Sequence, residues 1–161
     1  MGRGFQGAVL RVIGARDHVV AVTAVERVTS SVIKVDFVSD TLLYDNGEKP
    51  TAWVRAWFPD PQGGSKLHQR AYTLVDPDPA TGRFSMCFLL HEPAGPAAYW
   101  ATNAKAGDEI VVQRLGGDGW ELDDPQPTGY VLVGDVAAWP AFVSIIAEAD
   151  KTVPIRVFFE Y

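Results

Sequence analysis

Short runs in which apolar and polar residues alternate recur through the first two thirds of the chain. Six runs are typical of β-strands and lie at 18–28, 32–38, 51–58, 71–75, 83–90 and 109–114. In the second run Ile33, Val35 and Phe37 fall on one face, as in a strand with one buried side. A short helix is expected at 97–104. This arrangement predicts a mainly β fold, a six-stranded, closed, Greek-key-like barrel, because closure removes exposed sheet edges.

The pattern changes after a stretch at 115–128 that is rich in Gly, Asp and Pro and typical of a linker. Beyond it lie a continuous apolar run at 130–133, helical spacing over 137–149 and a second apolar run at 154–159. Apolar runs on either side of a helix predict a β-α-β unit with parallel strands.

We therefore divide the chain into a barrel domain, 1–127, and a β-α-β unit, 128–161, of the kind that opens an α/β nucleotide-binding domain. Two strands and one helix cannot bury both faces of their sheet. The protein could lack the rest of such a domain, further chain could complete it, or the unit could pack against the barrel or a second copy. An uncovered apolar face favours self-association.

The first 17 residues have weak periodicity, and the apolar residues between 9 and 13 would form a short helix or an arm against the barrel. Arg3, Arg11 and Arg16 suit contact with a membrane surface or a neighbouring domain, and equally an ordinary solvated face. We find no signal-peptide pattern and no stretch near the roughly 20 apolar residues that span a membrane. We expect a cytoplasmic protein, which could also lie at the inner face of the membrane.

Composition excludes several functions. A net charge of −6 argues against nucleic acid as a main partner. Cys87, the single cysteine, excludes an internal disulfide and is expected as a buried core thiol. The histidines at 18, 68 and 91 have no metal-binding spacing, so we predict no metal site. No nucleophile elbow or paired-carboxylate motif occurs, so no residue is assigned as catalytic.

Candidate chemistry concentrates between two paired strands and the helix that follows them. Its polar and turn residues are Arg70, Tyr72, Thr73, His91, Gly95 and Pro96. The chain is expected to turn at 76–79 and again at 81–82. Proline suits the first helical position, and the free amides at a helix start favour a phosphate. The stretch predicts a site for a planar ligand that bears phosphate.

The motifs RAYT, a strand ending in His, GPAxxWA and AGDEI occur in this order. They resemble the flavin-binding domain of siderophore-interacting proteins, a branch of the ferredoxin-reductase-like flavoproteins. The segments GRGFQGAVLRVIGARDH and TAWVRAWFPDP are more similar to actinobacterial members. Those members include the flavin domain fused in front of an iron–siderophore ABC transporter, which implies contact with such a transporter.

This resemblance implies FAD as cofactor. Arg70 would neutralise the flavin pyrophosphate, Tyr72 would stack on or hydrogen-bond the flavin, and Thr73 would bond the isoalloxazine or the ribityl chain. The remaining implied cofactor-binding residues are His91, Gly95, Pro96, Ala97, Trp100, Ala101 and Asp135. Two alternatives stay open: His91 could bond the loop backbone, and Trp100 could be core packing. Trp53, Trp57 and Phe58 are expected as core or barrel-rim packing.

The sequence departs from the family pattern at three places. Leu74 and Val75 follow Thr73 where many members have a second arginine. The last barrel strand is followed by Leu-Gly-Gly rather than by Gly-Pro-Gly-Gly. Trp139 occupies a position that is usually small or aliphatic. The first two departures bear on the phosphate contacts, and the third bears on how nicotinamide reaches the flavin.

The resemblance implies a flavin-dependent ferric-siderophore reductase, in which NAD(P)H is the co-substrate and siderophore-bound Fe(III) accepts electrons. Release of iron would follow, because hard oxygen ligands suit Fe(III) better than Fe(II). One alternative is a non-catalytic flavin-binding or docking module that has lost its nicotinamide domain. A weaker alternative is a barrel without cofactor that serves only in partner interaction.

Overall fold

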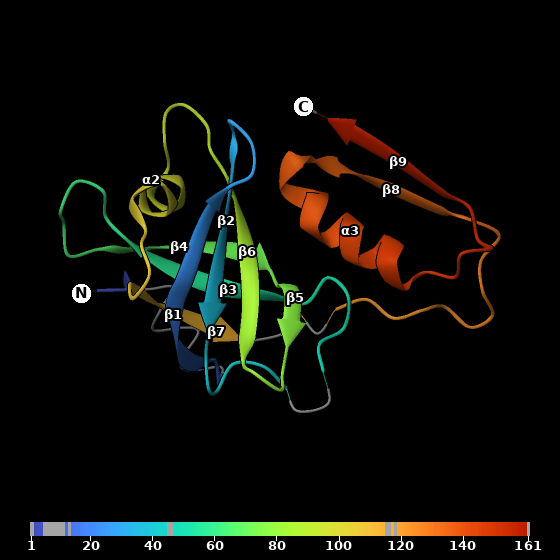
Figure 1. Cartoon of the computed structure of the whole chain (residues 1–161), viewed down its shortest axis with the longest axis horizontal. Coiled ribbons are helices and arrows are strands. Elements are labelled where there is room, and N and C mark those ends of the chain that lie inside the picture. The colour runs from blue at the N-terminus through green and yellow to red at the C-terminus, as the bar shows by residue number, and fades with distance from the viewer. Residues whose placement is uncertain are drawn as a thin grey trace.

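A computed structural model describes residues 2–4, 12, 14–44, 47–114, 117 and 119–160. It has two units that lie beside one another, an antiparallel barrel and a C-terminal β-α-β unit (Figure 1). The elements of the barrel are β1 Arg16–Arg27, β2 Val32–Val38, β3 Trp53–Pro59, β4 Leu67–Thr73, β5 Val75–Asp78, β6 Arg83–Leu89, α2 Pro96–Asn103 and β7 Glu109–Arg114. The predicted mainly β fold is confirmed.

The barrel is one curled sheet in the order β4-β3-β7-β1-β2-β6-β5, and every neighbouring pair is antiparallel. Its two edge strands, β4 and β5, are consecutive in the chain and are separated only by Leu74. Leu74 is buried, and its N–H donates to the carbonyl of Ala52 at 2.8 Å. A single bent segment therefore pairs with β3 over its first half and with β6 over its second half.

This bend explains why the structure has seven barrel strands where the pattern predicts six. The predicted turn at 76–79 is wrong, because residues 75–78 form β5 and the chain turns at 79–82 instead. Asp76 has a φ of +46°, and the pairing of β5 with β6 shifts register between Val75 and Asp78. A strand that pairs along one side only tolerates Pro77, which has no N–H to donate.

The alternation in β2 matches its burial: Ile33, Val35 and Phe37 are buried, whereas Lys34 and Asp36 are only partly covered. The barrel core also takes inward side chains from β1, β3, β6 and β7. Its fully buried members include Val20, Val54, Phe58, Met86, Phe88 and Val112. The prediction for Trp57 is confirmed, since it is buried and its indole N–H donates to Gln113 Oε1 at 2.8 Å.

The C-terminal unit consists of β8 Tyr130–Asp135, a 3-10 turn η1 Val136–Ala138, α3 Trp139–Glu148 and β9 Ile155–Glu160. The predicted β-α-β order is confirmed, and β8 and β9 pair in parallel. The helix covers one face of the two strands. At Gly134 an added Cβ would lie 2.8 Å from Ala138 Cβ and 3.0 Å from Phe142 Cζ, so glycine permits this close packing.

The remaining predictions concern the N-terminal segment, the linker, membrane spans and metal sites. The proposed N-terminal helix or arm falls mostly on residues 5–11 and 13, which lie outside the described residues. Between 119 and 129 the chain forms no helix or strand, as a linker would, although the domain boundary itself stays a prediction. Within the described ranges no helix is long and apolar enough to cross a membrane. Nor do the described His, Cys, Asp and Glu residues gather into a metal-binding cluster.

Candidate cofactor-binding site

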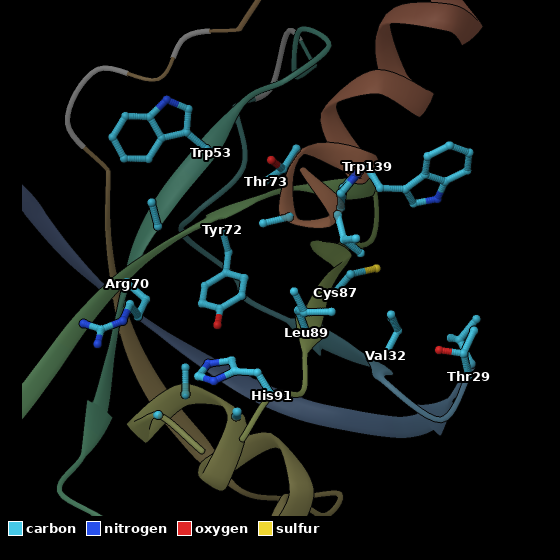
Figure 2. Close-up of a pocket in the computed structure, with 18 residues that line it drawn as sticks. Thr29, Val32, Trp53, Arg70, Tyr72, Thr73, Cys87, Leu89, His91 and Trp139 are labelled. Atoms are coloured by element: carbon cyan, nitrogen blue, oxygen red, sulfur yellow. The ribbon is translucent and has the colours of Figure 1, made fainter. Parts of the chain in front are cut away.

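A cavity of about 560 Å³ lies where the C-terminal unit meets the barrel (Figure 2). Its walls come from β4, β6, the start of α2, the turn between β1 and β2, and the segment from η1 into α3. Figure 2 shows Arg70, Tyr72 and His91 toward one end, and Val32 and Trp139 toward the other. The cavity is large enough for a cofactor-sized molecule.

Arg70 and Thr73 belong to β4, next to the bend at Leu74. The Arg70 side chain is exposed, and its Nη1 donates to the carbonyl of Gln69 at 2.7 Å. A guanidinium carries five N–H donors, so most of the N–H groups of Arg70 stay available to an anion. Thr73 adds a hydroxyl to the same wall.

The Tyr72 side chain lies between the cavity and the barrel core. Its ring lies 4.5 Å from the ring of Phe88 and 5.8 Å from that of Phe58, measured between centroids. Burial raises the pKa of the Tyr72 phenol well above its ordinary value, and the charge of Arg70 opposes this only in part. The hydroxyl therefore keeps its proton at neutral pH and can donate a hydrogen bond to a ligand.

The start of α2 closes the polar end of the cavity. Gly95 is its N-cap without a side-chain hydrogen bond, and Pro96 occupies the first turn. The backbone amides of Ala97 and Ala98 have no carbonyl partner within such a helix, and both residues line the cavity. An added Cβ at Gly95 would lie 3.7 Å from His91 Cε1 and Nε2, so the imidazole lies directly beside the N-cap. This end can hold a phosphate.

Six of the ten predicted site residues line the cavity: Arg70, Tyr72, Thr73, His91, Gly95 and Ala97. Pro96 shapes the helix start. Trp100 and Ala101 pack inward, with the Trp100 ring stacked 6.2 Å from that of Phe37 and Ala101 buried in the core. Their contact with a cofactor stays a prediction, and in the structure they fasten α2 to the barrel.

Asp135 also does not line the cavity, but it shapes the opposite wall. Its carboxylate Oδ1 accepts hydrogen bonds from the amides of Ala137 at 2.9 Å and Ala138 at 3.3 Å. These bonds cap η1, whose Val136 and Ala137 line the cavity. Direct contact between Asp135 and a cofactor likewise stays a prediction.

Sequence reasoning missed several lining residues. Cys87 is only half-buried and lines the cavity, so the expectation of a buried core thiol is wrong. Burial still raises the pKa of this thiol, which therefore resists ionisation. Cys87 and Leu89 lie on the outward face of β6, opposite Met86 and Phe88. Two apolar residues on an outward face were a signal that something covers this part of the barrel.

Two aromatic residues also line the cavity, Trp53 and Trp139. Trp53 was expected in packing, and the structure places it on the cavity wall with the guanidinium of Arg55 4.4 Å from its ring centroid. Gly117 approaches that ring so closely that an added Cβ would lie 2.7 Å from Trp53 Nε1. Trp139 lines the other end of the cavity. The family resemblance relates Trp139 to the approach of nicotinamide to the flavin, whereas its place on the cavity wall depends on where the C-terminal unit docks.

Comparison with known proteins supports the family resemblance that the sequence motifs indicate. The profile of the siderophore-interacting FAD-binding domain matches residues 18–118, more than half of the sequence. The chain is 46% identical over 160 residues to the mycobactin import ATP-binding/permease protein IrtA of Mycolicibacterium smegmatis, covering 99% of this chain and 19% of IrtA. IrtA of Mycobacterium tuberculosis is 44% identical over 161 residues, with the same coverage. The chain thus spans about a fifth of the length of these relatives.

Solved structures agree on the fold. A siderophore-interacting protein from Acinetobacter baumannii superposes with a TM-score of 0.75 at 20% identity, covering 89% of this chain and 58% of that one. A siderophore utilization protein from T. fusca also reaches 0.75, at 25% identity, covering 90% and 60%. A ferredoxin-NADP+ reductase from Plasmodium falciparum reaches 0.63 at 13% identity, covering 89% and 60%. With its profile match, its close relatives and this fold, the chain belongs to the siderophore-interacting FAD-binding domain family.

Proposed function

We propose that the chain binds FAD in the cavity between its two units and acts as the flavin-binding part of an NAD(P)H-dependent ferric-siderophore reductase. One observation carries the proposal: an arginine fork, a protonated phenol and the free amides of a helix start share one end of a cofactor-sized cavity. The rest of that cavity is largely apolar. A dinucleotide with a charged centre and planar rings needs this combination.

The residues have distinct roles in this proposal. Arg70 and the amides of Ala97 and Ala98 bind the pyrophosphate, because a cationic fork and a helix N-terminus both favour anionic oxygens. Tyr72 and Thr73 donate hydrogen bonds to the ring system or the ribityl chain. His91 lies beside the N-cap and orients the phosphate end of the ligand. A flavin held by these residues would supply the redox chemistry, which is hydride acceptance and single-electron transfer.

The electron acceptor in this proposal is siderophore-bound Fe(III). It is supported by the names of the relatives, one of which imports mycobactin and others of which interact with siderophores. Reduction weakens a complex built from hard oxygen ligands, which prefer Fe(III). We further propose that the chain works on the cytoplasmic side of the membrane, beside a transporter, because the segment it matches belongs to an ATP-binding/permease protein.

One observation favours the alternative of a flavin-binding or docking module without turnover. The cavity wall from the C-terminal unit is formed by Val136, Ala137, Trp139 and Pro140, which are all apolar. None of these side chains carries a charge to pair with the phosphates of a nicotinamide dinucleotide, and the indole N–H of Trp139 is the single hydrogen-bond donor among them. A reductase would need those groups from elsewhere.

The test begins with titration of the purified chain with FAD and FMN, followed by visible absorption. We expect saturable FAD binding, weakened about tenfold or more in Arg70→Ala, because a hydrogen bond to a charged group contributes roughly 1.5–3 kcal/mol. Arg83→Ala is the matched control, since Arg83 is exposed on β6 and does not line the cavity. No binding of either flavin would contradict both functions.

Turnover separates the two functions once binding is established. NADH or NADPH oxidation that depends on a ferric siderophore supports the reductase. FAD binding of normal affinity without any such oxidation supports the module instead.

A further inference from the structure

The two ends of the cavity differ in chemistry. The phosphate end holds Arg70, His91 and the start of α2. The opposite end, which we call the ring end, is lined by Thr29, Val32 and Trp139, so it is largely apolar (Figure 2). An apolar lobe beside a charged one is the form expected for a ligand with a phosphate centre and a flat, largely apolar ring.

Trp139 is the aromatic side chain at the ring end among the described residues that line the cavity. Its side chain is 52% exposed, which is unusual for so large an apolar group. Behind it the ring of Phe159 lies 5.5 Å away, between centroids, at an angle of 45°. One part of the indole is therefore supported by protein, while much of its surface is left for another partner.

The backbone beneath Trp139 is held by contacts within the C-terminal unit and by a hydrogen bond to the barrel. Asp135 caps the turn that precedes it, and Pro140 restricts the first turn of α3. One turn further along, the hydroxyl of Ser144 accepts a hydrogen bond from the N–H of Thr51, next to β3, at 3.0 Å. The indole is thus held at the ring end before any ligand arrives, which lowers the entropic cost of a contact.

We propose that Trp139 contacts the isoalloxazine of bound FAD, so that the C-terminal unit completes a flavin site that the barrel alone leaves open. This rests on the proposed function, since it assumes that the pyrophosphate lies at the phosphate end. From there one ring of the dinucleotide enters the ring end, and the indole packs against it as aromatic rings do. The bulky indole acts here as a binding wall.

The test compares Trp139→Ala and Trp139→Phe with wild type in titrations with FAD, FMN and ADP. We expect Trp139→Ala to weaken FAD and FMN binding about two- to tenfold, the range for one aromatic contact, and to leave ADP binding unchanged. Trp139→Phe should recover most of the affinity. Trp120→Ala is the matched control, because Trp120 packs against Tyr130 and does not line the cavity.

Cys87 provides a second readout, since it is the single cysteine and lines the cavity near the ring end. Bound FAD should slow alkylation of Cys87 by N-ethylmaleimide at least about threefold in wild type, and less in Trp139→Ala.

The outcomes separate this inference from the proposed function. Equal FAD and FMN affinities in wild type and Trp139→Ala overturn the inference alone. Loss of ADP binding with unchanged FMN binding also overturns it, by placing adenine against the indole. Failure of wild type to bind any flavin overturns the inference together with the proposed function.

Discussion

The barrel and the C-terminal unit differ in how completely each covers its own apolar surface. The barrel buries the inward side chains of β1, β2, β3, β6 and β7, and the bend at Leu74 joins its two sheet edges. The C-terminal unit has two strands, and α3 covers one of their faces. On the other face Val133 is 71% exposed and its cross-strand partner Phe158 is 55% exposed.

Because of this difference, the two units contribute different kinds of wall to the cavity. The barrel supplies the rigid wall with Arg70 and Tyr72, whereas the C-terminal unit supplies an apolar wall that depends on docking. Elements with few buried apolar contacts open at lower free energy than a closed core does. One wall of the cavity therefore belongs to the more stable barrel and the other to the less stable C-terminal unit. The following predictions test that contrast.

The largest expected effect is in the barrel core. Phe37→Ala should lower the free energy of unfolding by about 3–5 kcal/mol, because Phe37 is fully buried and the cavity left behind cannot close. Phe158→Ala, the same change on the open face, should alter it by no more than about 0.5 kcal/mol. Urea denaturation followed by circular dichroism gives both values. Similar losses in the two variants would show that the contrast between the units is wrong.

An intermediate effect is expected on self-association, which the open face of β8 and β9 favours. Sedimentation velocity should show association that grows with concentration. Val133→Lys should weaken it about tenfold or more, because an ammonium group would be buried without a partner in the interface. A monomer at every concentration in wild type would contradict this prediction.

The smallest expected effect is a pH response confined to the barrel. Burial, helped by the charge of Arg114, lowers the pKa of His18 below its ordinary value, against the opposing hydrogen bond with Thr41. Below a pH of about 6.5 the unfolded chain then binds more protons at this site than the folded chain, so barrel stability falls as the pH falls. His18→Gln should flatten this dependence.

Hydrogen exchange at pH 7.5, 6.5 and 5.5 measures the two units separately. Amides of β1 should lose protection as the pH falls, while those of β8 should not. In the C-terminal unit the N–H of Thr152 holds the pKa of Asp150 below its ordinary value, so that carboxyl responds only in stronger acid. Equal losses in β1 and β8, or an unchanged slope in His18→Gln, would argue against the assignment to His18.

Much of the fold was predictable because the barrel follows local rules. The alternation of Ile33, Val35 and Phe37 predicts β2, and Pro96 predicts the start of α2 within one residue. The bend at Leu74 was not predictable, because pairing with β6 across the barrel draws 75–78 into a strand despite Pro77. A turn signal describes local preference, and tertiary pairing overrides it.

The same division applies to the candidate site. Sequence alone determined the strand pattern and the β-α-β order, because these depend on neighbours along the chain, and the family resemblance indicated the cluster of Arg70, Tyr72 and His91. Tertiary structure decided that Trp100 fastens α2 to the core, and that Cys87 and Trp139 share one cavity. Those two residues lie on separate units, and only the docking of one unit on the other brings distant positions to a common surface.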